Sequence, residues 1–305
     1  LIERVSSDDE QYRMPPIGMP LSQEQIDALK QWISAKAPSP DDEVAEKDPT
    51  EHWAFQVPTR PERPAVLNSS WPRNEIDYFL QAQFDKRGLT PVGDATPAQL
   101  IRRAYLDLVG LPPTVDQLNA FLSDPSDAKY RALVDELLAS PQYGERWARH
   151  WMDVVRYTDT YGYEWDMPAK GAWRYRDYLI RAFNADVGFD QLVREQIAGD
   201  LLDKPRLNHE LHINESLIGP MFFQMGEKRD GDSWEFNGIH QEMLDNKIDA
   251  FSKALLATAV ACARCHDHKI DPVAQKEYYA LAGAFMSSRW LTNTVDLPER
   301  NAAAI

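Results

Sequence analysis

The sequence contains little cysteine, no run of basic residues and no long apolar segment. Cys262 and Cys265 are the only cysteines among 305 residues, which excludes a fold held by several disulfides. A net charge of −15 disfavours nucleic acid and anionic membrane surfaces as partners. No apolar run approaches the roughly 18 residues of a membrane span. Hydrophobic residues still make up 43% of the chain, which is typical of a folded protein.

Alternating strand patterns are also missing, and helical patterns dominate. Ile26, Leu29 and Ile33 recur at helical spacing, so residues 1–38 are expected to hold a helix that ends near Pro38. Residues 39–70 are rich in proline and acidic groups, which predicts an extended linker. Helical patterns then cover 114–123, 128–139, 143–158, 171–184 and 189–201, with long loops at 159–170 and 202–240.

Capping residues predict where helices begin. Ser22 and Gln25 match a capping box, and Thr96 followed by Pro97 predicts another helix start. The predicted fold is therefore mainly α, with an irregular multi-helix domain and long ordered loops over residues 71–305.

The two cysteines lie in the segment Cys262-Ala-Arg-Cys265-His266, which has the C-x-x-C-H spacing of covalent c-type haem attachment. In such a motif the thiols form thioethers with the haem vinyl groups, and the histidine binds iron on the proximal side. A structural zinc site would need a second cysteine pair, and a dithiol redox pair normally accompanies a βαβ pattern. The motif therefore predicts one haem c in the helical domain.

The flanking residues predict how this haem would be covered. Apolar residues at helical spacing from Leu244 to Leu255 predict a helix that continues to Cys262, on its buried face. Asp271 and Pro272 predict the start of the next helix.

The motif does not determine the distal ligand of the iron. His150, His240 and Met243 are rival candidates for this position. His268 is too close to His266 to reach the opposite face of the ring. It could bond a haem propionate, carry protons, or be held structurally by a neighbouring aspartate.

Two further groups of polar residues have alternative interpretations. Arg174 and Arg176 could pair with haem propionates, because planar guanidinium groups match carboxylates; the alternative is salt bridges with nearby aspartates. Arg156 and Tyr157 could belong, with His150, to a proton-handling pocket or to a structural network of ion pairs.

The segment Tyr12-Arg13-Met14-Pro15-Pro16 resembles the end of a class I cytochrome c. In that family a methionine in a proline-containing loop is the distal iron ligand, and a C-terminal helix follows. The resemblance implies that residues 1–38 are the remnant of a small all-α cytochrome c domain, with Met14 as a ligand of a second, upstream haem. The alternative is a loop methionine that packs against Ile17 and Trp32.

Long segments from Trp53 to about Arg289 resemble the second haem module of the planctomycete-type cytochrome family. The matching segments are LIRRAYLDLVGLPPT, YGERWARHWMDVVRYTDTYGYEWD, WRYRDYLIRAFNADVGFDQLVREQIAGDLL and CARCHDHKIDPVAQKEYYALAGAF. The resemblance implies an exported, multi-domain haem c protein whose catalytic role is largely unassigned. It also implies that the chain given is part of a longer polypeptide.

These observations predict a redox protein, with three functions left open. The first is electron transfer between a partner domain and the upstream cytochrome. The second is a haem-dependent oxidoreductase with an open distal site, with His150, Arg156, Tyr157 or His268 as catalytic residues. The third is an interaction scaffold whose core the haem completes.

The predicted cofactor also suggests a compartment and partners. Covalent haem attachment takes place outside the bacterial cytoplasm, which predicts a periplasmic or exterior location. The expected partners are other redox domains or cytochromes. Calcium is compatible with the many acidic residues, but no twelve-residue loop with the required ligand spacing supports it.

Overall fold

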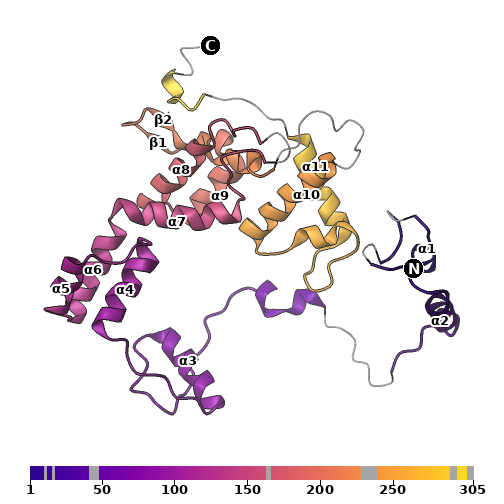
Figure 1. The fold of residues 1–305 in the computed structure, drawn as a ribbon, viewed down its shortest axis with the longest axis horizontal. Helices are drawn as coiled ribbons and strands as arrows, with labels where there is room; N and C mark the ends of the chain where they lie inside the picture. The colour runs from indigo at the N-terminus through magenta and orange to yellow at the C-terminus, as the bar shows by residue number, and fades with distance from the viewer. Residues whose placement is uncertain are drawn as a thin grey trace. The chain divides into compact units, whose positions relative to one another are not determined.

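The computed structural model is mainly α-helical, which confirms the predicted fold class (Figure 1). The residues that it describes are 1–9, 12–15, 18–40, 48–162, 166–227, 239–288 and 294–300. The chain forms two compact units, Leu1–Phe55 and Gln56–Ile305. The division between them lies within the stretch 39–70 that the sequence predicts to be a linker. Among the described residues, no helix is long and apolar enough to cross a membrane.

The first unit contains two short helices, α1 (Ile2–Val5) and α2 (Gln23–Ser34). α2 begins with the predicted capping box, in which the Gln25 amide and the Ser22 hydroxyl are 3.3 Å apart. In the predicted linker, two 3-10 turns at Pro49–Glu51 and Trp53–Phe55 interrupt the extended chain. The linker is therefore less extended than its composition predicts.

Four helices open the second unit and are started by polar caps. They are α3 (Glu75–Lys86), α4 (Pro97–Leu108), α5 (Val115–Leu122) and α6 (Asp127–Leu138). In each of them, the side chain of the N-cap residue accepts a hydrogen bond from the backbone N–H three residues later. This bond satisfies a donor that the helix leaves unpaired. Ile101, Phe121 and Leu137 form the core between α4, α5 and α6.

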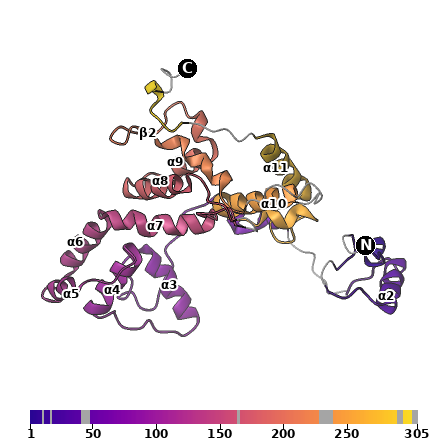
Figure 2. The same cartoon turned by 45° about the horizontal axis from the view of Figure 1, so that its top comes forward.

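The central part of the unit is formed by α7 (Pro141–Val154), α8 (Ala172–Asn184) and α9 (Phe189–Ala198). α7 and α8 lie side by side (Figure 2). Gly144 permits this close approach, because a Cβ there would lie 2.4 Å from the Ile180 carbonyl oxygen. After α9 the chain forms a small antiparallel pair, β1 (Leu207–Asn208) and β2 (Ile213–Asn214). The sequence predicted only loop there, because two residues per strand are too few to show alternation.

A buried ionic network ties α8 and α9 to the loop that follows them. Glu195 is fully buried, and its carboxylate accepts two hydrogen bonds of 3.0 Å from Arg206 and one of 2.7 Å from the Tyr178 hydroxyl. Glu215 is buried beside it and pairs with Arg181 at 2.5 and 2.8 Å. These bonds compensate for the cost of removing the carboxylates from water.

The last helices surround the cysteine motif. α10 (Ile239–Phe251) leads through a π-helical turn, Ser252–Leu256, into the 3-10 helix η8 (Val260–Arg264), and α11 (Gln275–Ser287) follows. α10, η8 and α11 pack against one another around Ile248, Val260, Ala263, Tyr278 and Ala282.

Replacing Glu195 with glutamine is expected to destabilise the fold strongly, since Arg206 would keep a largely buried charge without its counter-charge. The expected loss in unfolding free energy is about 3–5 kcal/mol, measured by urea denaturation. Arg194→Gln is the matched control, because the Arg194 side chain is 59% exposed in its pair with Asp190. A change below about 1 kcal/mol is expected for the control. Equal effects of both variants would contradict the importance of the buried pair.

The same pair predicts how stability depends on pH. Burial alone would raise the pKa of Glu195, but hydrogen bonds from Arg206, Tyr178 and Gln191 outweigh it and lower the pKa. The stabilisation is therefore complete above the unfolded pKa of about 4.3, and it is lost as pH falls through the lower folded-state value. In urea denaturation across pH, the difference between wild type and Glu195→Gln should be constant near neutrality and shrink in acid. A difference that grows in acid would contradict this sign.

Candidate functional site

The cysteines of the motif lie on the outer side of η8. Cys262 and Cys265 are both exposed, whereas Val260 and Ala263 are buried. The prediction that Cys262 lies on the buried face of a continuous helix is therefore wrong. The chain adopts a left-handed conformation at Ala257, with φ of 53°, so the register of α10 does not continue into the motif.

Arg264, which precedes Cys265, fixes the motif to its neighbours. Its carbonyl oxygen accepts hydrogen bonds of 3.1 Å from the Gln275 side chain and from the Tyr279 hydroxyl. Its guanidinium lies 3.4 Å from Asp245 of α10. Asp245 also accepts a 2.8 Å bond from the Tyr278 hydroxyl, and burial together with this bond raises the pKa of Tyr278. α10 and α11 therefore hold the motif in a defined position.

His266 is exposed, and its ring has a defined orientation. Its Nδ1 lies 2.7 Å from the carbonyl oxygen of Asp267. A carbonyl oxygen can only accept a hydrogen bond, so Nδ1 carries the proton in this arrangement. In the neutral ring Nε2 then has its lone pair available, as a metal ligand requires.

His268 is held structurally, as one of its predicted alternatives states. Its Nδ1 accepts from the backbone amides of Ile270 at 3.1 Å and Asp271 at 2.7 Å. Its Nε2 lies 3.6 Å from an Asp271 carboxylate oxygen. α11 begins at Gln275 and not at Asp271–Pro272 as predicted, because these contacts keep the preceding residues in a turn.

An apolar stripe on α11 adjoins the motif. Tyr279 and Met286 are 56% and 75% exposed, and Gly283 lies between them on the same helix face. A Cβ added to Gly283 would have no atom within 4 Å, although glycine inside a helix costs about 1 kcal/mol relative to alanine. The Tyr279 hydroxyl bonds the Arg264 carbonyl oxygen, so the stripe begins beside the residue that lies between the two cysteines.

The predicted residues of α7 and α8 face away from the buried core. His150 is exposed and packs edge-on against Trp147, with ring centroids 5.3 Å apart. Arg174 is exposed and lies over the ring of Trp173. Arg176 pairs with Asp177 at 2.8 Å, which is the salt bridge predicted as the alternative to a propionate contact.

The remaining candidates of the second unit lie on α10 and directly after α7. His240 is exposed in the first turn of α10, and Met243 is half-buried one turn later. The Tyr157 hydroxyl donates to Asp159 at 2.7 Å, and burial together with this bond raises the pKa of Tyr157 to about 12. Arg156 directly precedes Tyr157, and its guanidinium bonds the Asn246 side chain of α10.

Met14 lies in the first unit, and its side chain is partly exposed. Its amide donates to the Arg4 carbonyl oxygen at 3.0 Å. Of its predicted alternative partners, Ile17 lies outside the described residues. Trp32 donates its indole N–H to the Pro38 carbonyl oxygen at 2.9 Å.

A comparison with protein-family models matches residues 75–289, from the start of α3 to just beyond α11. The chain belongs to the PSCyt2 family. This family is described as a protein of unknown function (DUF1549). A search of the curated proteins and a search of the solved structures found no match to the chain.

The buried ionic network of this PSCyt2 chain was not predicted as a feature of the sequence. Glu195 and Arg206 are 11 residues apart, and Arg181 and Glu215 are 34 apart. Pairing over such distances leaves no local spacing signal. The only sequence signal is that Glu195 and Gln196 occupy a helix position where the apolar pattern of α9 would place hydrophobic side chains.

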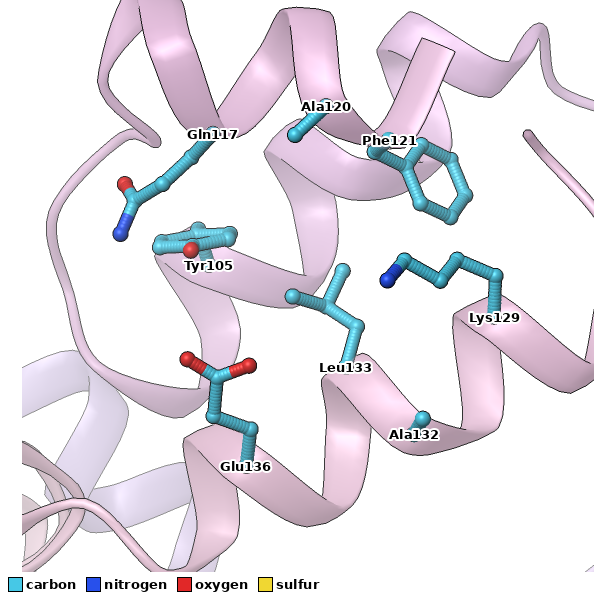
Figure 3. A pocket seen from close by; sticks show the side chains of 8 residues that line it. All are labelled: Tyr105, Gln117, Ala120, Phe121, Lys129, Ala132, Leu133 and Glu136. Carbon is cyan, nitrogen blue, oxygen red and sulfur yellow. The ribbon is translucent and has the colours of Figure 1, made fainter. Parts of the chain in front are cut away.

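A cavity of about 150 Å³ lies between α4, α5 and α6 of the PSCyt2 match. Figure 3 shows Lys129, Leu133 and Glu136 of α6 directed toward α4 and α5. The lining residues are Tyr105, Gln117, Ala120, Phe121, Lys129, Ala132, Leu133 and Glu136. None of the residues predicted from sequence as site residues is among them. In the described part of the chain, no group of three or more His, Cys, Asp or Glu side chains is arranged to hold a metal ion.

Both thiols of the haem-free PSCyt2 chain are expected to react rapidly with a thiol reagent, because both cysteines are exposed. The reduced, folded protein should release two equivalents of the coloured product of Ellman's reagent in one fast phase. Cys262→Ser and Cys265→Ser should each release one equivalent. A thiol that reacts only after unfolding would contradict the outward position of the cysteines.

Proposed function

We propose that this PSCyt2 chain carries one c-type haem on Cys262, Cys265 and His266 and transfers electrons outside the cytoplasm. The observation that carries the proposal is the outward position of all three side chains on a segment whose opposite side is buried. Covalent attachment requires that haem can reach both thiols. The buried side of the segment would then hold the attached haem in a constant environment, which a defined redox potential requires.

The residues present fit a haem in three respects. Two thiols and a histidine stand at the attachment spacing, and the ring proton of His266 is held on Nδ1, which leaves Nε2 for iron. The stripe of Tyr279, Gly283 and Met286 offers apolar contact for a planar ring. When bound, the haem supplies an iron that alternates between ferrous and ferric states. Cys262 and Cys265 would hold the ring covalently, His266 would serve as the proximal ligand, and the stripe on α11 would offer apolar contact.

Electron transfer is favoured over catalysis because the candidate proton carriers are not poised for it. Nδ1 of His268 already accepts hydrogen bonds from two backbone amides. The pKa of Tyr157, raised to about 12, is far from the neutral range in which a general acid or base works best. His150 is exposed beside Trp147.

The partner would then be a second redox centre. The resemblance of residues 1–38 to a cytochrome c end makes an upstream haem with Met14 as ligand the proposed electron partner. Other redox domains or cytochromes are the further partners of this proposal. Because covalent haem attachment takes place outside the bacterial cytoplasm, the proposed location is the periplasm or the cell exterior.

The test is production of the chain in the bacterial periplasm together with a cytochrome c maturation system. We expect one covalent haem per chain by pyridine haemochrome absorption, with a low-spin spectrum that carbon monoxide does not change. The paired variant Cys262→Ser/Cys265→Ser should fold and carry no covalent haem.

Two outcomes separate the parts of the proposal. A folded wild-type chain without covalent haem would overturn the haem assignment. A high-spin ferric spectrum, with a ferrous form that binds carbon monoxide, would overturn electron transfer in favour of the open-site oxidoreductase. Cys262→Ser/Cys265→Ser controls for haem that merely adheres to the surface.

A further inference from the structure

Arg156 is a largely buried cation with an unmatched hydrogen-bonding edge. It follows α7 in a left-handed conformation, with φ of 60°. Burial lowers the pKa of its guanidinium. Its Nη1 bonds the Oδ1 of Asn246, whereas Nε and Nη2 are buried and have no hydrogen-bond partner among the residues that the structure describes. A buried donor without an acceptor is costly, and such groups are rare in folded proteins.

Two other arginines of the same chain show what this edge normally binds. Arg181 directs Nε and Nη2 to the two carboxylate oxygens of Glu215, at 2.5 and 2.8 Å. Arg206 directs the same two nitrogens to the two oxygens of Glu195, both at 3.0 Å. Nε and Nη2 point in one direction and match a carboxylate in a two-pronged way. In Arg156 no carboxylate of the described residues bonds this edge.

Among the described residues, no carboxylate forms an ion pair with Arg156. The charge of Asp249 stabilises the guanidinium, but its carboxylate already bonds Lys253 at 2.7 Å. Lys247 lies near enough for the two cations to repel, and burial together with Arg156 lowers the pKa of Lys247.

The backbone opposite Arg156 is adapted to the guanidinium. Gly226 has φ of 94°, and a Cβ there would lie 2.8 Å from Nη1 of Arg156. A side chain at this position would therefore displace the guanidinium, so Gly226 leaves room for Arg156.

We propose that the Nε and Nη2 edge of Arg156 binds the carboxylate of a ligand. The carboxylate has two chemical sources: a free organic acid, or a propionate of a haem bound by the same chain. The site itself does not rest on haem binding, since the unmatched edge exists in the haem-free fold.

The test uses succinate as the probe, added to the haem-free and to the haem-loaded chain at constant ionic strength. Calorimetric titration and the midpoint of thermal unfolding report binding. The haem-free chain should bind succinate and gain thermal stability. Binding by both forms assigns a free organic acid, and binding by the haem-free form alone assigns a haem propionate. No binding by the haem-free form would overturn the proposal, whether or not haem attaches.

Three variants make the test specific. Arg156→Lys removes the two-pronged edge but keeps the charge, and it should weaken succinate binding at least about tenfold. Asn246→Asp places a carboxylate of the protein itself beside the Arg156 guanidinium. This variant should therefore have a higher unfolding midpoint without ligand and should bind succinate more weakly. Arg194→Lys, at an exposed arginine of α9, is the control and should bind like wild type. Succinate binding that is unchanged in both Arg156→Lys and Asn246→Asp would overturn the proposal.

Discussion

Burial of one side of η8 is the constraint on which the candidate site depends. Val260 and Ala263 are three residues apart, so in a 3-10 helix they share one face, and both are packed against α10 and α11. Cys262 lies on another face of η8 and Cys265 directly follows it, and both are exposed. Arg264 adds the second part of the constraint, since its carbonyl and guanidinium are both bound by neighbouring helices. The motif is therefore anchored between its two exposed cysteines.

The parts of the fold that sequence reasoning predicted are those set by local chemistry. The caps of α2 and α4 stand where Ser22 and Thr96 indicated, because an N-cap needs only residues within one turn. The exposure of Cys262 was missed, because helical periodicity cannot show the left-handed residue at Ala257 that interrupts it. The contacts of Glu195 and of Arg156 were missed for a different reason. They depend on tertiary packing between segments that carry no shared local pattern.

The acidic chain uses its buried arginines in two different ways. Arg181 and Arg206 each neutralise a buried carboxylate and so join helices to the loop after α9. Arg156 presents the same donor edge without an acceptor in the described part of the chain. The first arrangement stabilises the fold, and the second is suited to a ligand.

The most direct measurement of the central claim is peptide mass analysis of the reduced protein isolated from the periplasm. Trypsin cleaves after Lys253, Arg264 and Lys269, so it places Cys262 and Cys265 on separate fragments. We expect fragments 254–264 and 265–269 to remain joined through a single haem after reduction. Recovery of both fragments as free thiols, from a maturation-competent host, would contradict haem attachment at this motif.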